Sequence, residues 1–465
     1  MEKRKPHIGM FGLMPELYRM IPELEKRLSV WVDEILNTIK GFATVTYPGI
    51  CDTRELVDSA VTAIERSGAD MMLVFPVTYA PSFISIRALS RVKLPIAVLN
   101  TQILCGFPSD AGPASFTDNE APTGTFDLTN ALFRNRIPFT LISGYSRDPG
   151  MYREIEQFAN AAMAASELRK VRIGVFGYPM NGSGDFMIDN TLLISHLGAE
   201  VIYLDLSELA SEAENAPEFE LRNQMEQDKK LFTIDKNLTT REHEESSRME
   251  WALRVMFKRY GLSAFTYHFD ALARDGRFKT LPMLAACKLL ADGYGFGGEG
   301  DVTSTAAVTI LQKLTGSADF FESWGMDFEV GAVLKNHMGE GNLNYARKDM
   351  PRRLVRVPYS FGGSVEYNAV PAFSLQEGEA TLINLTTSPD GEISIIAAEG
   401  KVPDFKPITG VDSPHGKFKP DTSFKEYLSA YAQAGGTHHG ALCYGRKAHD
   451  LKMLCDILKL RFTRV

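Results

Sequence analysis

Short runs of β-forming residues alternate with longer amphipathic stretches through the first part of the chain. This alternation constrains the fold most, because strands joined by helical crossovers pair in parallel and form a sheet that is covered on both faces. The pattern predicts strands at 7–11, 43–47, 71–75, 96–99 and 139–142 and helices at 21–39, 53–65 and 149–168. We therefore expect an N-terminal α/β domain over residues 1–170.

The same alternation starts again at residue 171. An apolar run at 171–177 is followed by a predicted helix at 189–197 and a strand at 200–204. Charged, helix-forming sequence then precedes a strand at 264–269 and a helix at 281–292. We expect a second α/β domain over residues 171–315.

Beyond about residue 352 the pattern changes to period-two runs that are separated by turns. These runs lie at 354–358, 364–371, 378–386 and 392–399. They predict an antiparallel sheet or a small barrel in a C-terminal domain over residues 316–465. The expected fold class is therefore α/β, with two Rossmann-like parallel-sheet domains followed by a β-rich, barrel-like domain.

The composition excludes several classes of protein. The chain has a formal net charge of −8 and lacks a long basic tract, which argues against binding to nucleic acid. No apolar run is long enough for a signal-peptide core or a membrane span. Its five cysteines are widely spaced without a CxxC motif, as expected in a reducing compartment. We expect a cytoplasmic protein that does not associate with membranes.

Carboxylates and imidazoles lie among glycines and aromatic residues in the second half of the chain. They are Glu299 in a Gly-rich run, Glu322 behind Phe320-Phe321, His337, and the pair His438-His439. Each has a simpler local explanation: Glu299 can lie in a solvated loop before an Asp301-capped helix, Glu322 on a helix surface, and each histidine in a structural hydrogen bond. Considered together, they suggest two glutamates and two histidines around one cation.

Mixed carboxylate and imidazole ligation suits a borderline-hard cation, Mn²⁺ first, with Co²⁺ or Mg²⁺ as alternatives. Neighbouring residues of an extended segment face opposite ways. One of His438 and His439 can therefore bind the metal while the other contacts a substrate.

The order of these motifs resembles the L-fucose/L-arabinose isomerase superfamily, on its arabinose isomerase side. The similarity runs through 264–266, 281–282, the Gly-rich run 293–301, Phe321-Glu322, His337-Met338 and 435–439. The resemblance implies isomerisation of an open-chain aldose to a ketose through a cis-enediol. It also implies that Glu299, Glu322, His337 and His439 are the metal ligands, that both glutamates are candidate catalytic acid and base, and that His438 binds substrate.

The resemblance also suggests substrate-binding residues, although the motifs that contain them are less specific. Met187 and Phe269 match substrate-contacting residues, although core packing explains both equally well. Two N-terminal family segments that contain Gln and His lack them here, at 12–18 and 119–124. In the family these segments bind the distal end of the sugar in a neighbouring subunit. The resemblance therefore implies a homo-oligomer with shared active sites. The altered segments imply a substrate other than L-arabinose, and Glu16 and Thr123 are the candidate specificity residues.

Two other functions remain open at this point. A sugar epimerase or an aldolase can use the same metal site, because an enediolate is an intermediate common to these reactions. A non-catalytic sugar-binding protein is the contrasting class. The presence of all four candidate ligands argues against it, because binding alone does not require two carboxylates around a metal.

Overall fold

The computed structural model describes residues 4–465. The chain divides into two compact units, one that ends at Ser166 and one that runs from Glu167 to Val465. We call them the first and the second unit. The predicted division into three domains, 1–170, 171–315 and 316–465, stays a prediction. Within residues 4–465, no helix combines the length and the apolarity that crossing a bilayer requires.

The first unit contains a parallel sheet in the order β2-β1-β4-β5-β6, with β3 also paired to β1. Its strands are β1 (His7–Leu13), β2 (Thr44–Thr46), β3 (Ile50–Cys51), β4 (Met71–Pro76), β5 (Ile96–Gln102) and β6 (Thr140–Tyr145). Its helices are η1 (Glu16–Met20), α1 (Leu24–Lys40), α2 (Arg54–Arg66), η2 (Ser82–Ile84), α3 (Ile86–Leu89), α4 (Pro113–Asp118), α5 (Ala121–Arg134) and α6 (Pro149–Leu168). Each strand and helix predicted for this region is present, and the parallel sheet is confirmed.

Helix α5 was not predicted from the sequence. It contains Pro122, Gly124 and Thr125, which are poor helix formers away from the first turn. Gly124 packs directly on the chain after β4, where an added Cβ would lie 2.6 Å from the backbone nitrogen of Ala80. Tertiary packing therefore stabilises this helix where local propensity does not.

The second unit begins with a four-stranded parallel sheet in the order β11-β10-β7-β8. Its strands are β7 (Arg172–Phe176), β8 (Glu200–Leu204), β10 (Ala264–Tyr267) and β11 (Gly295–Gly297). The helices around it are η3 (Gly184–Phe186), α7 (Asn190–Leu197), α8 (Leu206–Glu214), α9 (Glu218–Leu231), α10 (Thr240–Tyr260), α11 (Phe269–Asp275), α12 (Met283–Ala291) and α13 (Val302–Thr315). The carboxyl end of β11 leads directly into Gly298 and Glu299, and open α/β sheets bind ligands at that edge.

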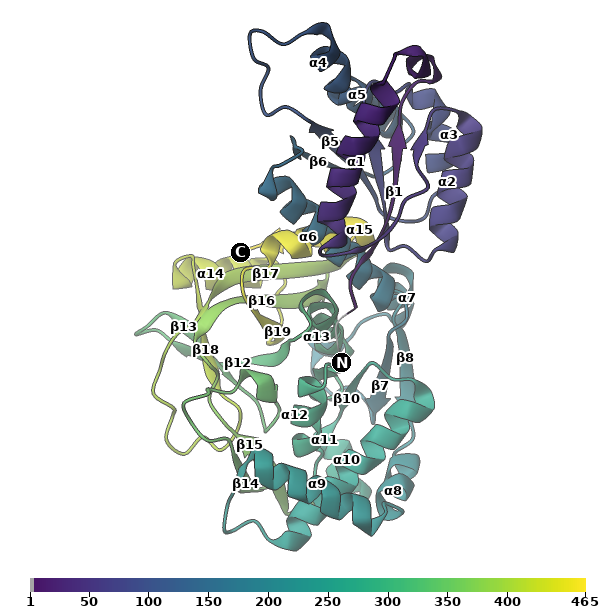
Figure 1. Cartoon of the computed structure of the whole chain (residues 1–465). Coiled ribbons are helices and arrows are strands. Elements are labelled where there is room, and N and C mark those ends of the chain that lie inside the picture. The colour runs from purple at the N-terminus through teal and green to yellow at the C-terminus, as the bar shows by residue number, and fades with distance from the viewer. Residues whose placement is uncertain (1–3) are drawn as a thin grey trace. The chain divides into compact units, whose positions relative to one another are not determined.

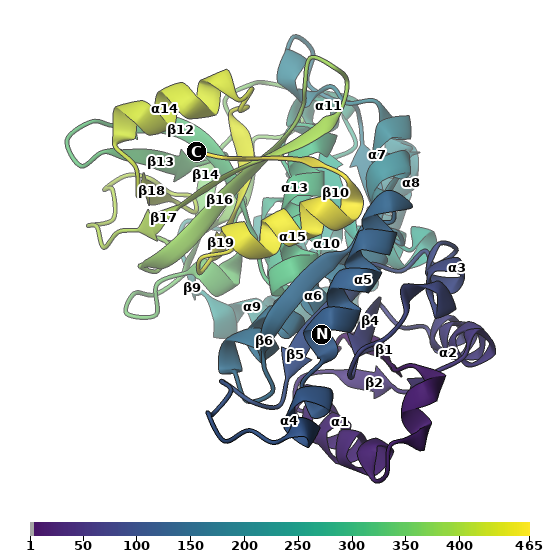
Figure 2. The same cartoon turned by 90° about the horizontal axis from the view of Figure 1, so that it is seen from above.

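A closed antiparallel barrel completes the second unit, in the order β16-β19-β12-β13-β18-β17 with β17 paired back to β16 (Figure 1). Its strands are β12 (Asp319–Asp327), β13 (Ala332–Asn336), β16 (Gly378–Thr387), β17 (Ile393–Val402), β18 (Gly416–Pro420) and β19 (His439–Tyr444), and β20 (Arg461–Arg464) adds to β17 in parallel. Helices α14 (Phe424–Gln433) and α15 (Ala448–Leu458) lie outside the barrel strands (Figure 2). The barrel-like C-terminal region is confirmed.

Two of the predicted period-two runs do not belong to this barrel. Strands β14 (Arg353–Pro358) and β15 (Tyr367–Ala372) form a separate three-stranded sheet with β9 (Thr233–Ile234). Alternating burial identifies a half-buried strand but does not identify its partner. The partner β9 is only two residues long and follows α9, so no sequence pattern marked it.

Candidate metal centre

Three neighbouring barrel strands bring three of the predicted ligands together. In the register of β12 and β19, Glu322 lies directly opposite His439. On its other side Glu322 lies opposite Asn336, the last residue of β13, and His337 follows at once. Directly opposed side chains of an antiparallel pair have Cβ atoms about 5 Å apart. The strand pairing therefore places Glu322, His337 and His439 at one end of the barrel.

The potential ligand atoms of these three side chains all lie within 4.8 Å of one another. Among residues 4–465, no hydrogen-bond partner is found for three of their buried polar atoms, Oε2 of Glu322, Nε2 of His337 and Nε2 of His439. Buried polar atoms without partners are rare because their desolvation is not compensated. One carboxylate and two imidazole nitrogens that face each other fit a divalent cation.

His337 is held by a second carboxylate. Its Nδ1 lies 2.6 Å from Oε2 of Glu340, which also accepts the backbone N–H of Gly339 at 2.9 Å. The other oxygen of Glu340 accepts a short hydrogen bond from the hydroxyl of Tyr267. Burial favours the neutral ring, but the Glu340 carboxylate, with smaller contributions from Glu322 and Glu299, raises the pKa of His337.

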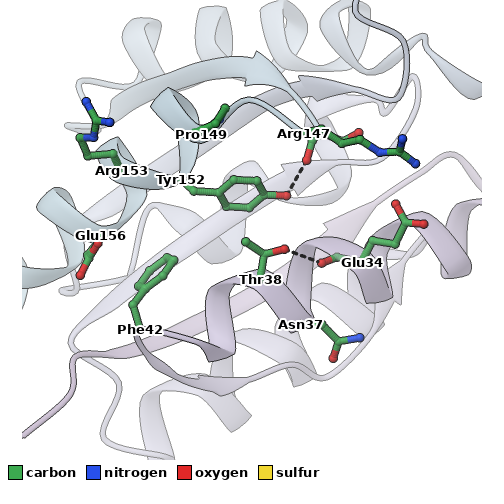
Figure 3. A pocket seen from close by; sticks show the side chains of 10 residues that line it. Glu34, Asn37, Thr38, Phe42, Arg147, Pro149, Tyr152, Arg153 and Glu156 are labelled. Carbon is green, nitrogen blue, oxygen red and sulfur yellow. Dashed lines mark hydrogen bonds between the residues drawn. The ribbon is translucent and has the colours of Figure 1, made fainter.

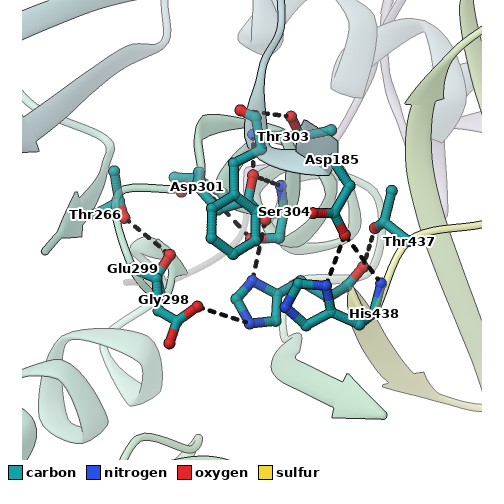
Figure 4. A network of polar contacts seen from close by, with 12 residues as sticks. Asp185, Thr266, Gly298, Glu299, Asp301, Thr303, Ser304, Thr437 and His438 are labelled. Carbon is teal, nitrogen blue, oxygen red and sulfur yellow. Dashed lines mark hydrogen bonds and ion pairs between the residues drawn. The ribbon is translucent and has the colours of Figure 1, made fainter. Parts of the chain in front are cut away.

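His439 is oriented in the same way by a different residue. Its Nδ1 lies 3.1 Å from Oδ2 of Asp301, and its ring stacks on Phe186 with centroids 4.9 Å apart (Figure 4). A carboxylate on Nδ1 fixes the ring and directs Nε2 toward the other potential ligand atoms, as it does at histidine-ligated metal sites. Both histidines therefore present Nε2 to the same space.

Glu299 reaches this site from the other sheet of the second unit. Its Oε2 lies 4.0 Å from Nε2 of His439, and its side chain is 14% exposed. Its backbone is left-handed, with φ at 61°, a conformation that few non-glycine residues adopt. Glu299 also forms a second potential ligand group with His438 and His439. The parallel sheet and the barrel thus each contribute a carboxylate.

The glycines on either side of Glu299 are required by close contacts. A Cβ on Gly298 would lie 2.8 Å from Nε2 of His337. At Gly300, φ is 78°, and a Cβ would lie 2.3 Å from the carbonyl oxygen of Tyr178. The Gly-rich run therefore lets the Glu299 loop pack against both the histidine and the chain after β7.

The two adjacent histidines have different environments. The side chain of His439 is 0% exposed, whereas that of His438 is 39% exposed. Nδ1 of His438 lies 2.6 Å from Oδ2 of Asp185, which is part of η3 (Figure 4). His438 therefore borders the ligand group from its more open side.

Of the remaining predicted substrate residues, two belong to the second unit and two to the first. Met187 follows η3 and is 67% exposed, and Phe269 begins α11 with its ring 5.4 Å from that of His268. Glu16 and Thr123 are exposed residues of η1 and α5 in the first unit. Their roles in substrate binding stay predictions.

The first unit has a pocket of its own. It measures about 850 Å³ and is lined by residues of α1 and of the segment from Ser146 into α6 (Figure 3). The hydroxyl of Tyr152 donates to the carbonyl oxygen of Ser146 there, at 2.6 Å. None of the predicted site residues lines it.

The sequence interpretation missed the residues that hold the histidines. Asp301 was recognised as a helix N-cap, which it is, but its contact with His439 was not foreseen. The sequence pattern assigned no role to Glu340 or Asp185. The available signals were weak: Asp301 stands two residues after Glu299, and Glu340 stands three residues after His337.

Comparison with known proteins agrees with this geometry. Residues 189–317 match the family model of the L-arabinose isomerase central domain, and residues 317–461 match that of the L-arabinose isomerase C-terminal domain. L-arabinose isomerase 1 of Bacillus licheniformis is 28% identical over 390 residues, which cover 80% of this chain and 76% of that protein. The L-arabinose isomerase of Thermotoga neapolitana is 28% identical over 413 residues, which cover 87% and 81%.

Solved structures that match are far more distant. The periplasmic binding protein of an arabinose ABC transporter from Shewanella sp. ANA-3 is 11% identical, covers 64% of this chain and 78% of its own, and has a TM-score of 0.18, too low to support any conclusion. The two domain matches together run from residue 189 to residue 461 and contain every candidate ligand. The chain therefore belongs to the L-fucose/L-arabinose isomerase superfamily, a group of aldose–ketose isomerases, which are intramolecular oxidoreductases.

Proposed function

We propose that this protein is a divalent-metal-dependent isomerase that interconverts an open-chain aldose and its ketose through a cis-enediol. The observation that carries the proposal is the set of three buried ligand atoms without partners among residues 4–465, on Glu322, His337 and His439. Glu299, whose Oε2 lies 4.0 Å from Nε2 of His439, is the fourth member of the set. The names of the relatives support the same reaction class.

Glu299, Glu322, His337 and His439 are the residues that would hold the cation, with Mn²⁺ the first choice for this donor set. When bound, such a cation polarises the carbonyl oxygen of the sugar and stabilises negative charge on neighbouring oxygens. Asp301 and Glu340 keep the two imidazole rings in the required orientation.

The reaction needs one proton to move between two carbons. A carboxylate removes the proton from C2 of the aldose, which leaves an enediol across C1 and C2, and a proton is then delivered to C1. The hydroxyl proton of O2 passes to O1, so that C1 is reduced and C2 is oxidised without an outside reductant. Glu299 and Glu322 are the two carboxylates that can serve as acid and base.

We also propose that L-arabinose is not the preferred substrate. Support comes from the two N-terminal segments in which this chain lacks the Gln and His of the family pattern. In the second of them, Glu120 accepts a hydrogen bond from Tyr18 at 2.8 Å within the first unit. A panel of aldoses and ketoses that includes L-arabinose tests this point, and L-arabinose as the best substrate would contradict it.

The metal requirement is tested by chelation followed by addition of Mn²⁺, Co²⁺ or Mg²⁺. We expect activity to be lost and then restored, with Mn²⁺ most effective. Glu299→Gln and Glu322→Gln should each abolish turnover while the fold is kept. Glu329→Gln, on the exposed turn after β12, is the matched control and should stay fully active. Full activity of either Glu299→Gln or Glu322→Gln would refute the assignment.

Product analysis by NMR in D₂O separates this reaction from related ones. Isomerisation introduces one solvent deuterium at C1 of the ketose and keeps the chain length. An epimerase would instead return an aldose with deuterium and inverted configuration at C2, and an aldolase would shorten the chain. We also expect a homo-oligomer in solution, which light scattering coupled to gel filtration tests.

A further inference from the structure

Two consecutive residues of η3, Asp185 and Phe186, contact the two consecutive histidines His438 and His439. Asp185 binds Nδ1 of His438 at 2.6 Å, and the Phe186 ring lies 5.2 Å from the His438 ring and 4.9 Å from the His439 ring. The two histidine rings are themselves 4.3 Å apart. One short turn between β7 and α7 therefore holds both rings.

The backbone of His438 has hydrogen bonds of its own, besides the 3.5 Å contact of its N–H with Oδ2 of Asp185. Its carbonyl oxygen accepts the backbone N–H of Ser323 at 2.8 Å, and the preceding residue, Thr437, is tied through its carbonyl oxygen to Tyr431 at 2.7 Å. The side chain is 39% exposed, and among residues 4–465 the hydrogen-bond partner found for its Nδ1 is Asp185. The Asp185 carboxylate sets its orientation together with ring contacts from Phe186 and His439.

The η3 turn is itself anchored. The Phe186 side chain is 1% exposed, and its carbonyl oxygen accepts the hydroxyl of Thr303 at 3.5 Å, in the first turn of α13. That turn of α13 begins at Asp301, the residue that orients His439. The carboxylates of Asp185 and Asp301 therefore approach the two histidines from connected parts of the second unit (Figure 4).

A carboxylate on one ring nitrogen of a neutral histidine selects the tautomer. With Nδ1–H donated to Asp185, Nε2 of His438 carries a lone pair and can accept a hydrogen bond from a hydroxyl group. His438 also offers a ring nitrogen within 4.8 Å of the ligand atoms of Glu299 and His439. An acceptor at this place suits a sugar hydroxyl beside the cation.

We propose that Asp185 is a positioning residue, which holds His438 in the Nδ1–H tautomer so that Nε2 accepts a hydroxyl group of the sugar. This inference rests on the proposed isomerase function and assigns part of its substrate recognition. Asp185 acts through His438 and does not contribute to metal binding.

The test is Asp185→Ala, which removes the acceptor of Nδ1–H. Asp185→Asn is the second variant, because its amide oxygen can still accept from Nδ1–H and from the backbone N–H of His438. Asp189→Asn is the control, because Asp189 lies four residues away, is exposed, and caps α7 through Thr191. Asn is an equally good N-cap.

Three measurements on the whole chain test whether Asp185 positions His438. Long-range ¹H–¹⁵N spectra of ¹⁵N-histidine-labelled protein, assigned with His438→Gln, report the tautomer of His438. Binding of L-arabinitol, an open-chain polyol, to the Mn²⁺-loaded protein reports hydroxyl recognition. Titration with Mn²⁺ followed by electron paramagnetic resonance reports the metal site alone.

We expect Asp185→Ala to move the His438 proton from Nδ1 to Nε2 and to weaken L-arabinitol binding about 10-fold, the scale of one lost hydrogen bond. The KM of the best sugar should rise by a similar factor, kcat should change less, and Mn²⁺ affinity should stay within about twofold. Asp185→Asn should keep the tautomer and most of the affinity, because its amide oxygen still accepts from Nδ1–H, and Asp189→Asn should change nothing.

Unchanged tautomer and polyol affinity in Asp185→Ala would overturn the inference. A loss of Mn²⁺ affinity as large as the loss of polyol affinity would also overturn the inference, because Asp185 would then support the metal site. If the wild-type protein isomerises no sugar, the proposed function fails. The tautomer and L-arabinitol measurements still decide the role of Asp185 in that event, because neither requires turnover.

Discussion

Oδ2 of Asp301 lies 3.1 Å from Nδ1 of His439, while Oδ1 of the same carboxylate accepts the backbone N–H groups of Thr303 and Ser304. One side chain therefore begins helix α13 and orients a candidate metal ligand. The two tasks use different oxygen atoms, so a single substitution can separate them.

Asp301→Asn should reduce metal affinity with little effect on folding. The amide oxygen keeps the helix cap, because Asn and Asp are similar N-caps, but the amide nitrogen places a donor against His439. We expect Mn²⁺ affinity to fall about 10–100-fold, measured by electron paramagnetic resonance. Thermal unfolding of the metal-free protein should barely change, and an unaltered Mn²⁺ affinity would contradict the orienting role.

Gly298→Ala should displace the ring of His337. The new methyl group would lie 2.8 Å from Nε2 and 2.9 Å from Cε1 of that ring, so the ring or the loop must move. Overpacking of this kind costs about 1–3 kcal/mol, and the loss should appear mainly as weaker Mn²⁺ binding and lower activity. Gly106→Ala is the control, because its Cβ would meet nothing within 4 Å.

Lys288→Met should destabilise the second unit. The Lys288 ammonium joins three helices, with Nζ 2.8 Å from Asp228 of α9 and 2.5 Å from Glu250 of α10. Removing it leaves Asp228 with His243 and Glu250 with Arg254 as remaining partners, so the cost should lie at the low end of that for a broken buried pair, about 3 kcal/mol. Lys229→Met, which breaks an exposed pair with Glu226, should cost about 0–1 kcal/mol in the same urea titration.

The same buried group predicts how stability depends on pH. Burial opposes charge on Asp228, yet His243 and Lys288 lower its pKa in the folded protein. The contribution of Asp228 to folding stability is therefore complete above about pH 3.9, its unfolded pKa, and is lost as the pH falls through its folded-state pKa. Burial also opposes charge on Lys288, yet Glu250 and Asp228 raise its pKa. Its contribution is complete below about pH 10.4 and is lost at higher pH.

Urea midpoints measured across this pH range check both limits. The alkaline loss should become smaller in Lys288→Met, because the variant no longer has the titrating ammonium. An equal loss of stability at alkaline pH in Lys288→Met and in wild type would show that another titrating group is responsible.

Much of the fold followed from local patterns. The five strands predicted for the first unit and the helix boundaries at Thr53, Asp189 and Asp301 are all present, because periodicity and capping are properties of adjacent residues. Helix α5 escaped prediction because packing of Gly124 outweighs its poor propensity. The local sequence left open a position of Glu322 on a helix surface, and pairing with β13 and β19 places it in a strand instead.

By itself, the sequence determined the succession of helices and strands, the class of each region and the residue types able to bind a cation. Only the tertiary structure decided that Glu322 lies opposite His439 on the adjacent strand. It also decided that Asp301 contacts His439, that Glu340 contacts His337 and that Asp185 contacts His438. The physical reason is the range of the interactions. Propensity, capping and periodicity act between neighbours, whereas strand register and the buried carboxylate–imidazole contacts join residues that only the folded chain brings together.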